Sequence, residues 1–193
     1  MDDTTNLTPP AVIAAITQAT ADSGFSMASD SQTGSLLRTL AATKPGGASL
    51  ELGTGTGLST AWILAGMSKA STLVSADNDE AVQSIARKHL GQDRRVSFRI
   101  AEGGAFLESL AGSKFDFIFA DTWPGKYTHL EAALGLLKPG GLYIVDDMLP
   151  QPNWPPRHEE KAHALITELE ARPDLMITKL GWATGLIVGA KNA

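Results

Sequence analysis

The sequence contains no cysteine, no long apolar run and no excess of positive charge, and each absence excludes a class of protein. Without cysteine the chain can form neither disulfide bonds nor thiolate metal sites, and it has no cysteine nucleophile. The longest apolar run, Ala61 to Met67, is far shorter than the about 20 residues that a membrane-spanning helix needs. A net charge of −5 argues against nucleic-acid binding, which depends largely on Lys and Arg replacing phosphate counterions.

The first residues are acidic and polar, and they lack the basic and apolar regions of a signal peptide. We therefore expect a soluble, cytoplasmic protein. A chain of 193 residues with 43% hydrophobic content can form one sizeable core. No linker or low-complexity tract divides it, so a single domain over 1–193 is expected.

Apolar runs with strand and helix periodicity alternate along most of the chain, which predicts an α/β fold with a largely parallel sheet. Two final strands are joined by only a few residues, so they must be antiparallel. The expected helices cover about 8–23, 32–43, 79–90, 104–111, 127–137 and 158–171, and a further helix runs through Ala61-Trp62-Ile63-Leu64. The first expected strand ends at Leu52, and the others cover 72–76, 95–100, 115–120, 142–146, 175–180 and 185–190.

Three glycines, Gly53, Gly55 and Gly57, turn the chain between an apolar strand and an apolar helix. Glycine accepts positive φ and lets a ligand approach the main chain, and the first N–H groups of the next helix favour a polar or anionic group. We expect a nucleotide-like cofactor here. The spacing fits neither the dinucleotide fingerprint, which needs Gly-x-Gly-x-x-Gly, nor the phosphate loop, because Leu58 and Ser59 stand where Gly and Lys are required.

The stretch Glu51 to Gly57 resembles motif I of the class I S-adenosylmethionine-dependent methyltransferases. In that family an acidic residue ending the second strand binds the ribose hydroxyls, and Asp77 follows Leu73-Val74-Ser75-Ala76 at the expected distance. The resemblance implies a Rossmann-like sheet of seven strands in the order 3-2-1-4-5-7-6, with helices on both faces and the seventh strand antiparallel. The stretch Leu136 to Gly141 before the fifth strand also resembles a family hallmark.

Three carboxylates, Asp121, Asp146 and Asp147, follow two strands that should be neighbours. Converging like charges need a cation or a raised pKa, and oxygen ligands alone favour Mg²⁺ or Ca²⁺. The alternative is that consecutive strand residues point to opposite faces, which leaves one Asp outside the cluster.

From about Ser26 to Val188 the chain resembles the metal-dependent branch related to catechol O-methyltransferase. In that branch Asp, Asp and Asn hold Mg²⁺, so the resemblance assigns the metal to Asp121, Asp146 and Asp147, the last replacing Asn. It also implies that N-terminal helices in 1–45 cover the cofactor and substrate cleft. The cofactor-binding residues that it implies are Met27, Ser29, Glu51, Gly53, Thr54, Gly55, Gly57, Ser59, Asp77, Asn78, Glu102, Gly103 and Asp121.

The lysine that serves as general base in catechol O-methyltransferase falls on Pro124, which cannot accept a proton. The candidates for this catalytic role are Lys126, Asp121 and His158. For His158, at the start of a charged helix, a solvated face is the favoured interpretation, as it is for His129. Trp123, Trp154 and Trp182 should lie at the carboxyl edge of the sheet and suggest a flat-walled, apolar acceptor pocket. Trp62, in the middle of a helix, should lie in the core.

The sequence thus predicts a methyltransferase that uses S-adenosylmethionine to O-methylate a small phenolic or catechol-like acceptor, with Mg²⁺ assisting or with no metal. The alternative is a catalytically inactive cofactor-binding protein that acts as a sensor or partner subunit. A nicotinamide oxidoreductase is opposed by the glycine spacing and the terminal hairpin. Nucleic-acid base methylation is opposed by the net charge and by the sequence after Asp121. Neither a nucleic acid nor a membrane is expected as a partner. The sequence does not decide whether the protein forms a homodimer.

Overall fold

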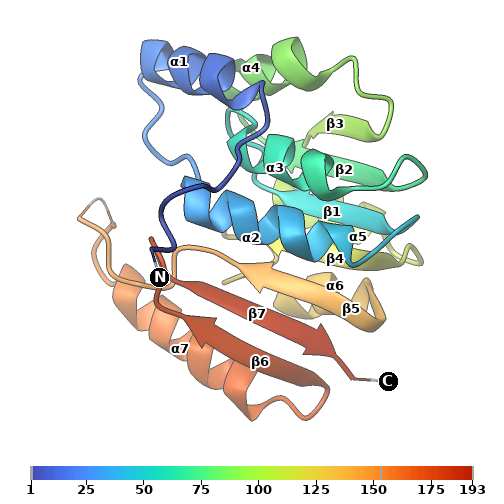
Figure 1. The fold of residues 1–193 in the computed structure, drawn as a ribbon. Coiled ribbons are helices and arrows are strands. Elements are labelled where there is room, and N and C mark those ends of the chain that lie inside the picture. The colour runs from blue at the N-terminus through green and yellow to red at the C-terminus, as the bar shows by residue number, and fades with distance from the viewer. Residues whose placement is uncertain (1, 153, 193) are drawn as a thin grey trace.

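The computed structural model describes residues 2–152 and 154–192, and its centre is a seven-stranded sheet (Figure 1). The strand order is β3-β2-β1-β4-β5-β7-β6, as the resemblance implied. The strands are β1 (Ala48–Leu52), β2 (Thr72–Asp77), β3 (Val96–Ile100), β4 (Phe115–Ala120), β5 (Leu137–Val145), β6 (Leu175–Leu180) and β7 (Leu186–Lys191).

Strands β1 to β5 are parallel, and β7 runs antiparallel to both β5 and β6. Leu50 of β1 pairs with Val74 of β2 on one side and with Ile118 of β4 on the other. The predicted α/β fold and its antiparallel final strand are therefore confirmed. Because β1, β2, β4 and β5 are parallel, the segments that follow them meet at one edge of the sheet.

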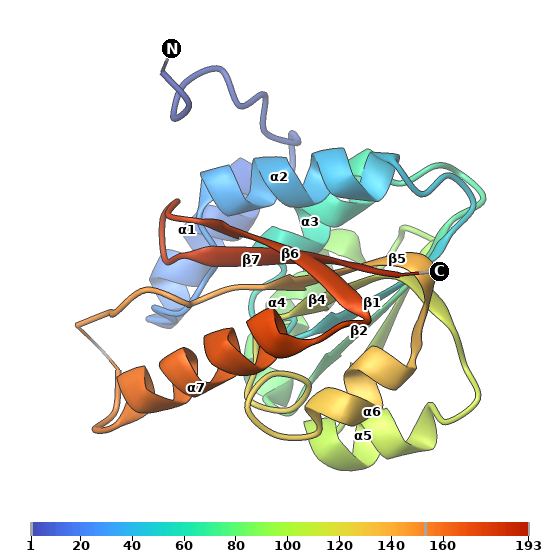
Figure 2. The same ribbon diagram turned by 90° about the horizontal axis from the view of Figure 1, so that it is seen from below.

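The helices form a layer on each face of the sheet (Figure 2). Residues of α1 to α4 share a core cluster that includes Ile16, Leu37 and the fully buried Trp62, which was expected in the core. Residues of α5 to α7 share a second cluster on the opposite face. The helices are α1 (Ile13–Ser23), α2 (Ser31–Ala42), α3 (Leu58–Gly66), α4 (Glu80–Leu90), α5 (Gly103–Ser109), α6 (Leu130–Gly135) and α7 (His158–Ala171).

Two helices begin later than the sequence predicts. Helix α1 starts at Ile13 rather than near Thr8, because Thr8 and Pro9 each precede a proline, which disfavours helical backbone at both. Helix α6 starts at Leu130 rather than 127, because the chain first turns back on itself, with the N–H of Gly125 donating to the Thr128 carbonyl at 2.6 Å. His129 has φ +56 and lies before the helix, although it is exposed as expected.

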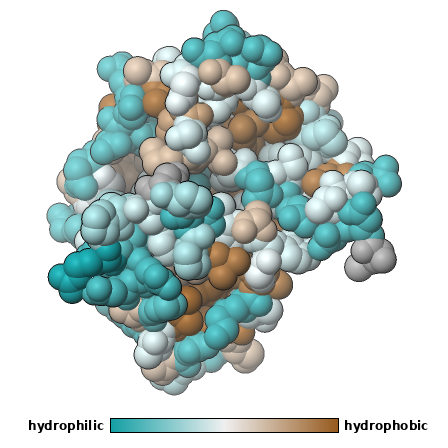
Figure 3. Space-filling view, turned by 90° about the vertical axis from the view of Figure 1, so that its left-hand side faces the viewer, coloured by the Kyte–Doolittle hydropathy of each residue, from teal (hydrophilic) through white to brown (hydrophobic). Residues whose placement is uncertain are grey.

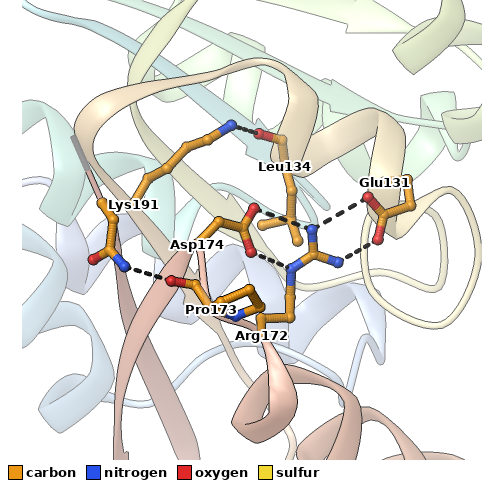
Figure 4. Close-up of polar contacts among 7 residues, drawn as sticks. Glu131, Leu134, Arg172, Pro173, Asp174 and Lys191 are labelled. Carbon is orange, nitrogen blue, oxygen red and sulfur yellow. Dashed lines mark hydrogen bonds and ion pairs between the residues drawn. The ribbon is translucent and has the colours of Figure 1, made fainter.

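Arg172, just after α7, connects the C-terminal elements to the rest of the fold (Figure 4). Its guanidinium group binds Glu131 of α6 and Asp174 before β6, with 2.9 Å between Nε and Asp174 Oδ1. The Lys191 ammonium group, at the end of β7, donates to the Leu134 carbonyl of α6. These bonds fix α7 and the β6–β7 hairpin against α6.

No helix in the described part of the chain combines the length and apolar character needed to cross a membrane. The cytoplasmic location predicted from the sequence stays a prediction.

Candidate active site

A cavity of about 430 Å³ lies at the carboxyl edge of the sheet, within the about 300–1,000 Å³ typical of small-molecule sites. Loops after β1, β2, β4 and β5 line it, together with residues 25–29 before α2 and the start of α7. The side of the molecule to which these strands point carries hydrophilic and hydrophobic residues side by side (Figure 3). The predicted site residues that line this cavity are Met27, Ser29, Gly53, Thr54, Gly55, Ser59, Asp77, Asn78, Asp121, Lys126, Asp146, Asp147 and His158.

The glycine turn brings main chain to the cavity wall at Gly53 and Gly55, which have φ of +101° and +53°. A Cβ on Gly53 would lie 2.8 Å from the carbonyl oxygen of Asp121, so only glycine fits there. The Asp77 carboxylate fixes the turn, because Oδ2 accepts from the Gly55 N–H at 2.8 Å and Oδ1 from the Asp79 N–H at 2.9 Å. The same carboxylate lines the cavity, where each oxygen can accept a further hydrogen bond.

Glu51 does not line the cavity, and its assignment as a cofactor-binding residue stays a prediction. It is completely buried behind the turn, where its carboxyl oxygens accept from Ser59 (2.7 Å), Thr60 (2.5 Å) and Ser75 (2.5 Å). Burial raises the pKa of Glu51 to about 7, although these hydroxyl donors lower it. Glu51 therefore holds β1, β2 and α3 together.

Gly57, Glu102 and Gly103 also lie outside the cavity lining, and their assignment as cofactor contacts stays a prediction. Gly57 lets α3 approach α4, since a Cβ there would lie 2.7 Å from the Cβ of Ala86. The exposed Glu102 caps α5 by accepting from two backbone N–H groups. Gly103 leaves room for the Pro124 ring, which a Cβ would approach to 2.7 Å.

Asp121, Lys126 and Asp146 form a group of ionisable side chains that also lines the cavity. Burial, and then the neighbouring Asp146 carboxylate, raise the pKa of Asp121 well above its usual value. The buried ammonium group of Lys126 lowers the pKa of both carboxyl groups, but by less than burial raises it. Lys126 Nζ donates to the Asp146 carbonyl at 2.6 Å, so the lysine is held directly among the acids.

The predicted metal site finds no support in this arrangement. Within residues 2–152 and 154–192, no three His, Asp or Glu side chains are grouped so that they could hold one metal ion. Oδ1 of Asp146 already accepts from the Thr184 hydroxyl at 2.5 Å and from the Asp147 N–H at 2.8 Å. Asp147 has φ +59 and stands outside β5, while Lys126 already brings a positive charge to the acids. The chain's donor set does not fit Mg²⁺ or Ca²⁺.

An aromatic wall, made of Trp123, Tyr127, Trp154 and His158, completes the cavity. His158 is only 7% exposed, so the favoured interpretation of a solvated face was wrong. The charged neighbours of His158 in the sequence suggested that its side chain is exposed to solvent, but its ring packs among the aromatic rings of the wall. Tyr127 and Thr184 also line the cavity and were missed, because neither is acidic, basic or glycine. Trp182 packs against the core cluster of α1 to α4 instead.

Known proteins share this sequence pattern and fold. A model of the family described as "Methyltransferase domain" matches residues 50–148, half of the chain. A Mycolicibacterium vanbaalenii protein named "Putative O-methyltransferase" is 31% identical over 148 residues, which cover 72% of this chain and 64% of that protein. This chain therefore spans less than two thirds of that curated relative.

Solved structures show the same fold over nearly the whole chain. The O-methyltransferase from Bacillus cereus in complex with S-adenosylhomocysteine gives a TM-score of 0.85 at 22% identity, covering 97% of this chain and 94% of that one. TomG from Streptomyces achromogenes, an O-methyltransferase in complex with S-adenosylmethionine, gives 0.85 at 20% identity and covers 99% and 94%. The solved structures show the fold, and the family model, which matches half of the chain, shows that the chain belongs to the methyltransferase-domain family.

Proposed function

We propose that the protein transfers a methyl group from S-adenosylmethionine to a hydroxyl oxygen of a small phenolic acceptor. One observation carries the proposal: the Asp77-fixed glycine turn and the group of Asp121 and Lys126 line the same cavity. The glycine turn suits an adenosyl amino acid, and the group of Asp121 and Lys126 suits an acceptor that loses a proton. The O-methyltransferase names of the relatives support oxygen as the atom that accepts the methyl group.

The cofactor would lie along the glycine turn, with its ribose hydroxyls donating to Asp77. Main-chain approach at Gly53 and Gly55 supports this placement, as do Asn78 and Ser59 in the same wall. The segment Phe25–Ser29 passes over this half of the cavity, and Ser29 Oγ donates to Asp121 Oδ2 at 3.3 Å. Of the N-terminal residues 1–45 that were predicted to cover the cleft, this segment is the part that lines the cavity.

The chemistry needs an acceptor oxygen about 3–3.5 Å from the methyl carbon and in line with the departing sulfur. The oxygen forms a bond to the methyl carbon as the carbon–sulfur bond breaks, and the acceptor proton moves to a base. We assign Asp121 as the base, because its carboxyl group lines the cavity and burial raises its pKa, which makes the carboxylate a stronger proton acceptor. The Lys126 ammonium group would stabilise the negative charge that develops on the acceptor oxygen.

We further propose that this reaction needs no metal ion. The donor set does not fit a divalent cation, and Lys126 already brings a positive charge to Asp146. This departs from the metal-dependent branch that the sequence resembles. The inactive cofactor-binding alternative is not favoured, because the cavity holds both an acid and a buried lysine beside the cofactor half.

The test measures methyl transfer to a panel of phenols and catechols with and without EDTA, in the wild type and in Lys126→Met. We expect turnover that is indifferent to EDTA and falls about 100-fold in Lys126→Met, the loss typical of one electrostatic donor. Lys69→Met, at an exposed lysine beyond α3, is the matched control. Activity that EDTA abolishes and Mg²⁺ restores would overturn the metal-free reaction. Binding of S-adenosylhomocysteine without turnover on any acceptor would favour the inactive alternative.

A further inference from the structure

Residues 25–29 join α1 to α2, and all five of them line the cavity (Figure 1). The segment begins against the glycine turn, where the Phe25 ring would lie 3.3 Å from a Cβ on Gly55. It ends at Ser29, whose hydroxyl donates to Asp121 at 3.3 Å. The segment therefore spans the cavity from the glycine turn to the proposed base.

The middle of this segment is held by side chains and not by hydrogen bonds. Within the described chain, the backbone groups of residues 26–28 make no hydrogen bond. Of these three residues only Met27 has a large apolar side chain, and this side chain is 68% exposed. Stretches with few hydrogen bonds and few buried contacts open easily. The packing of this segment over a bound ligand therefore depends on Met27.

Met27 is also one of two exposed methionines in the part of the chain that the structure describes. Met176, on the edge strand β6, is 70% exposed, whereas Met67 and Met148 are 7% and 6% exposed. The chain contains no cysteine, so no thiol within it competes for an oxidant. A peroxide should therefore react first at Met27 and Met176, and only Met27 lines the cavity.

We propose that Met27 is a modification site at which oxidation by a peroxide weakens cofactor binding. The sulfur forms a bond to one peroxide oxygen as the oxygen–oxygen bond breaks. The thioether is oxidised to a sulfoxide, and hydrogen peroxide is reduced to water, which carries away the second oxygen and both hydrogens. The change converts a flexible apolar side chain into a polar one, and methionine sulfoxide reductases reverse it.

The effect on binding follows from the position of Met27 in the cavity wall. A ligand between the glycine turn and residues 25–29 would exclude water from the part of Met27 that it covers. The thioether is apolar and adapts to such a contact, whereas a sulfoxide would lose the water that hydrates its oxygen. We expect binding that is about tenfold weaker after oxidation. The inference rests on the proposed function, because the ligand concerned is the proposed cofactor, and it adds regulation of that site.

The first test treats the protein with hydrogen peroxide and follows each methionine by peptide mass spectrometry. Met27 and Met176 should be oxidised well before Met67 and Met148. Saturation with S-adenosylhomocysteine should slow the oxidation of Met27 relative to that of Met176. Because both residues are measured in the same sample, Met176 corrects for peroxide that the ligand consumes.

The second test measures the dissociation constant of S-adenosylhomocysteine by calorimetry, before peroxide treatment and after the peroxide has been removed. The constant should rise about tenfold in the wild type and in Met176→Leu, the matched control, and methionine sulfoxide reductases should restore it. Met27→Leu keeps an apolar side chain without sulfur. Its constant after treatment, divided by its constant before treatment, should be near one whatever the starting affinity.

Met27 that stays reduced while Met176 is oxidised would overturn the inference. An unchanged dissociation constant in the oxidised wild type would also overturn it, as would an equal rise in Met27→Leu. Failure of the proposed function looks different. Untreated wild type without affinity for S-adenosylhomocysteine would refute the proposed function and this role of Met27 together, whereas binding that oxidation leaves unchanged would refute the inference alone.

Discussion

Glu51 is an acidic side chain that the fold encloses completely, held by three hydroxyl donors. Its pKa of about 7 lies above its ordinary value of 4.5, so the folded protein binds this proton more tightly than the unfolded chain. The resulting stabilisation is complete below about pH 4.5 and is lost as the pH rises through about 7. The difference of about 2.5 between these values corresponds to about 3 kcal/mol.

The substitution Glu51→Gln should remove this part of the pH dependence. Glutamine keeps an oxygen for the hydroxyl donors but cannot ionise, so the variant should lose less stability than the wild type between pH 4.5 and pH 8. The measurement is urea unfolding of both proteins at several pH values in this range. Parallel curves of unfolding free energy against pH would show that Glu51 is not the group responsible.

At the residue scale, the sequence predicted the parts of the site that depend on main-chain geometry. Gly53 and Asp77 were found because a tight turn and the end of a strand leave a clear pattern. The burial of Glu51 and His158 was not foreseen, because spacing along the chain does not report burial. Glu51 immediately precedes the turn but points behind it, and His158 has charged neighbours in the sequence but a buried ring.

At the scale of elements, the contact between α3 and α4 depends on Gly57. Its φ of +95 is unfavourable for other residues, and a Cβ would lie 2.7 Å from the Cβ of Ala86. Gly57→Ala should therefore destabilise the protein by about 3 kcal/mol, from backbone strain and overpacking together. Gly112→Ala is the matched control, because Gly112 has φ +88 and nothing within 4 Å of the added Cβ.

Chemical denaturation of the two variants separates the two causes. The control should lose only about 1–2 kcal/mol, the strain of positive φ alone. Equal losses of unfolding free energy in both variants would mean that α3 and α4 accommodate the added methyl group without cost. The packing role of Gly57 would then be contradicted.

Most strands were predicted more accurately than the helix starts, for a physical reason, although β5 begins at Leu137 and not at the expected 142. A buried parallel strand is a short apolar run with turn residues at each end, and β4 (Phe115–Ala120) was predicted with its observed bounds. Helix α6 was predicted three residues too early, because the turn from Trp123 to Thr128 is fixed by backbone hydrogen bonds that no side-chain pattern reveals.

At the scale of the molecule, the cavity joins segments far apart in the sequence, from the loop before α2 to Thr184 beside β7. Only the sheet order β3-β2-β1-β4-β5-β7-β6 brings them together. The resemblance to a family predicted this order, whereas composition and periodicity indicated only an α/β fold. The position of the Lys126 ammonium group beside Asp146 was not predicted, since it depends on where a loop places one side chain.

Because the cavity is built by the whole fold, a ligand that occupies it should stabilise the whole molecule. At 100 times its dissociation constant, S-adenosylhomocysteine should add about 2.7 kcal/mol and raise Tm by about 5–10 °C for a chain of this length. Asp77→Asn should weaken binding at least about tenfold, because a charged acceptor for the ribose hydroxyls becomes neutral, and the rise in Tm at the same concentration should shrink. Asp22→Asn, at an exposed position at the end of α1, should respond like the wild type. Thermal melts of the three proteins over a ligand series decide the matter: an equal rise in Asp77→Asn would show that the ligand is held elsewhere than at the glycine turn.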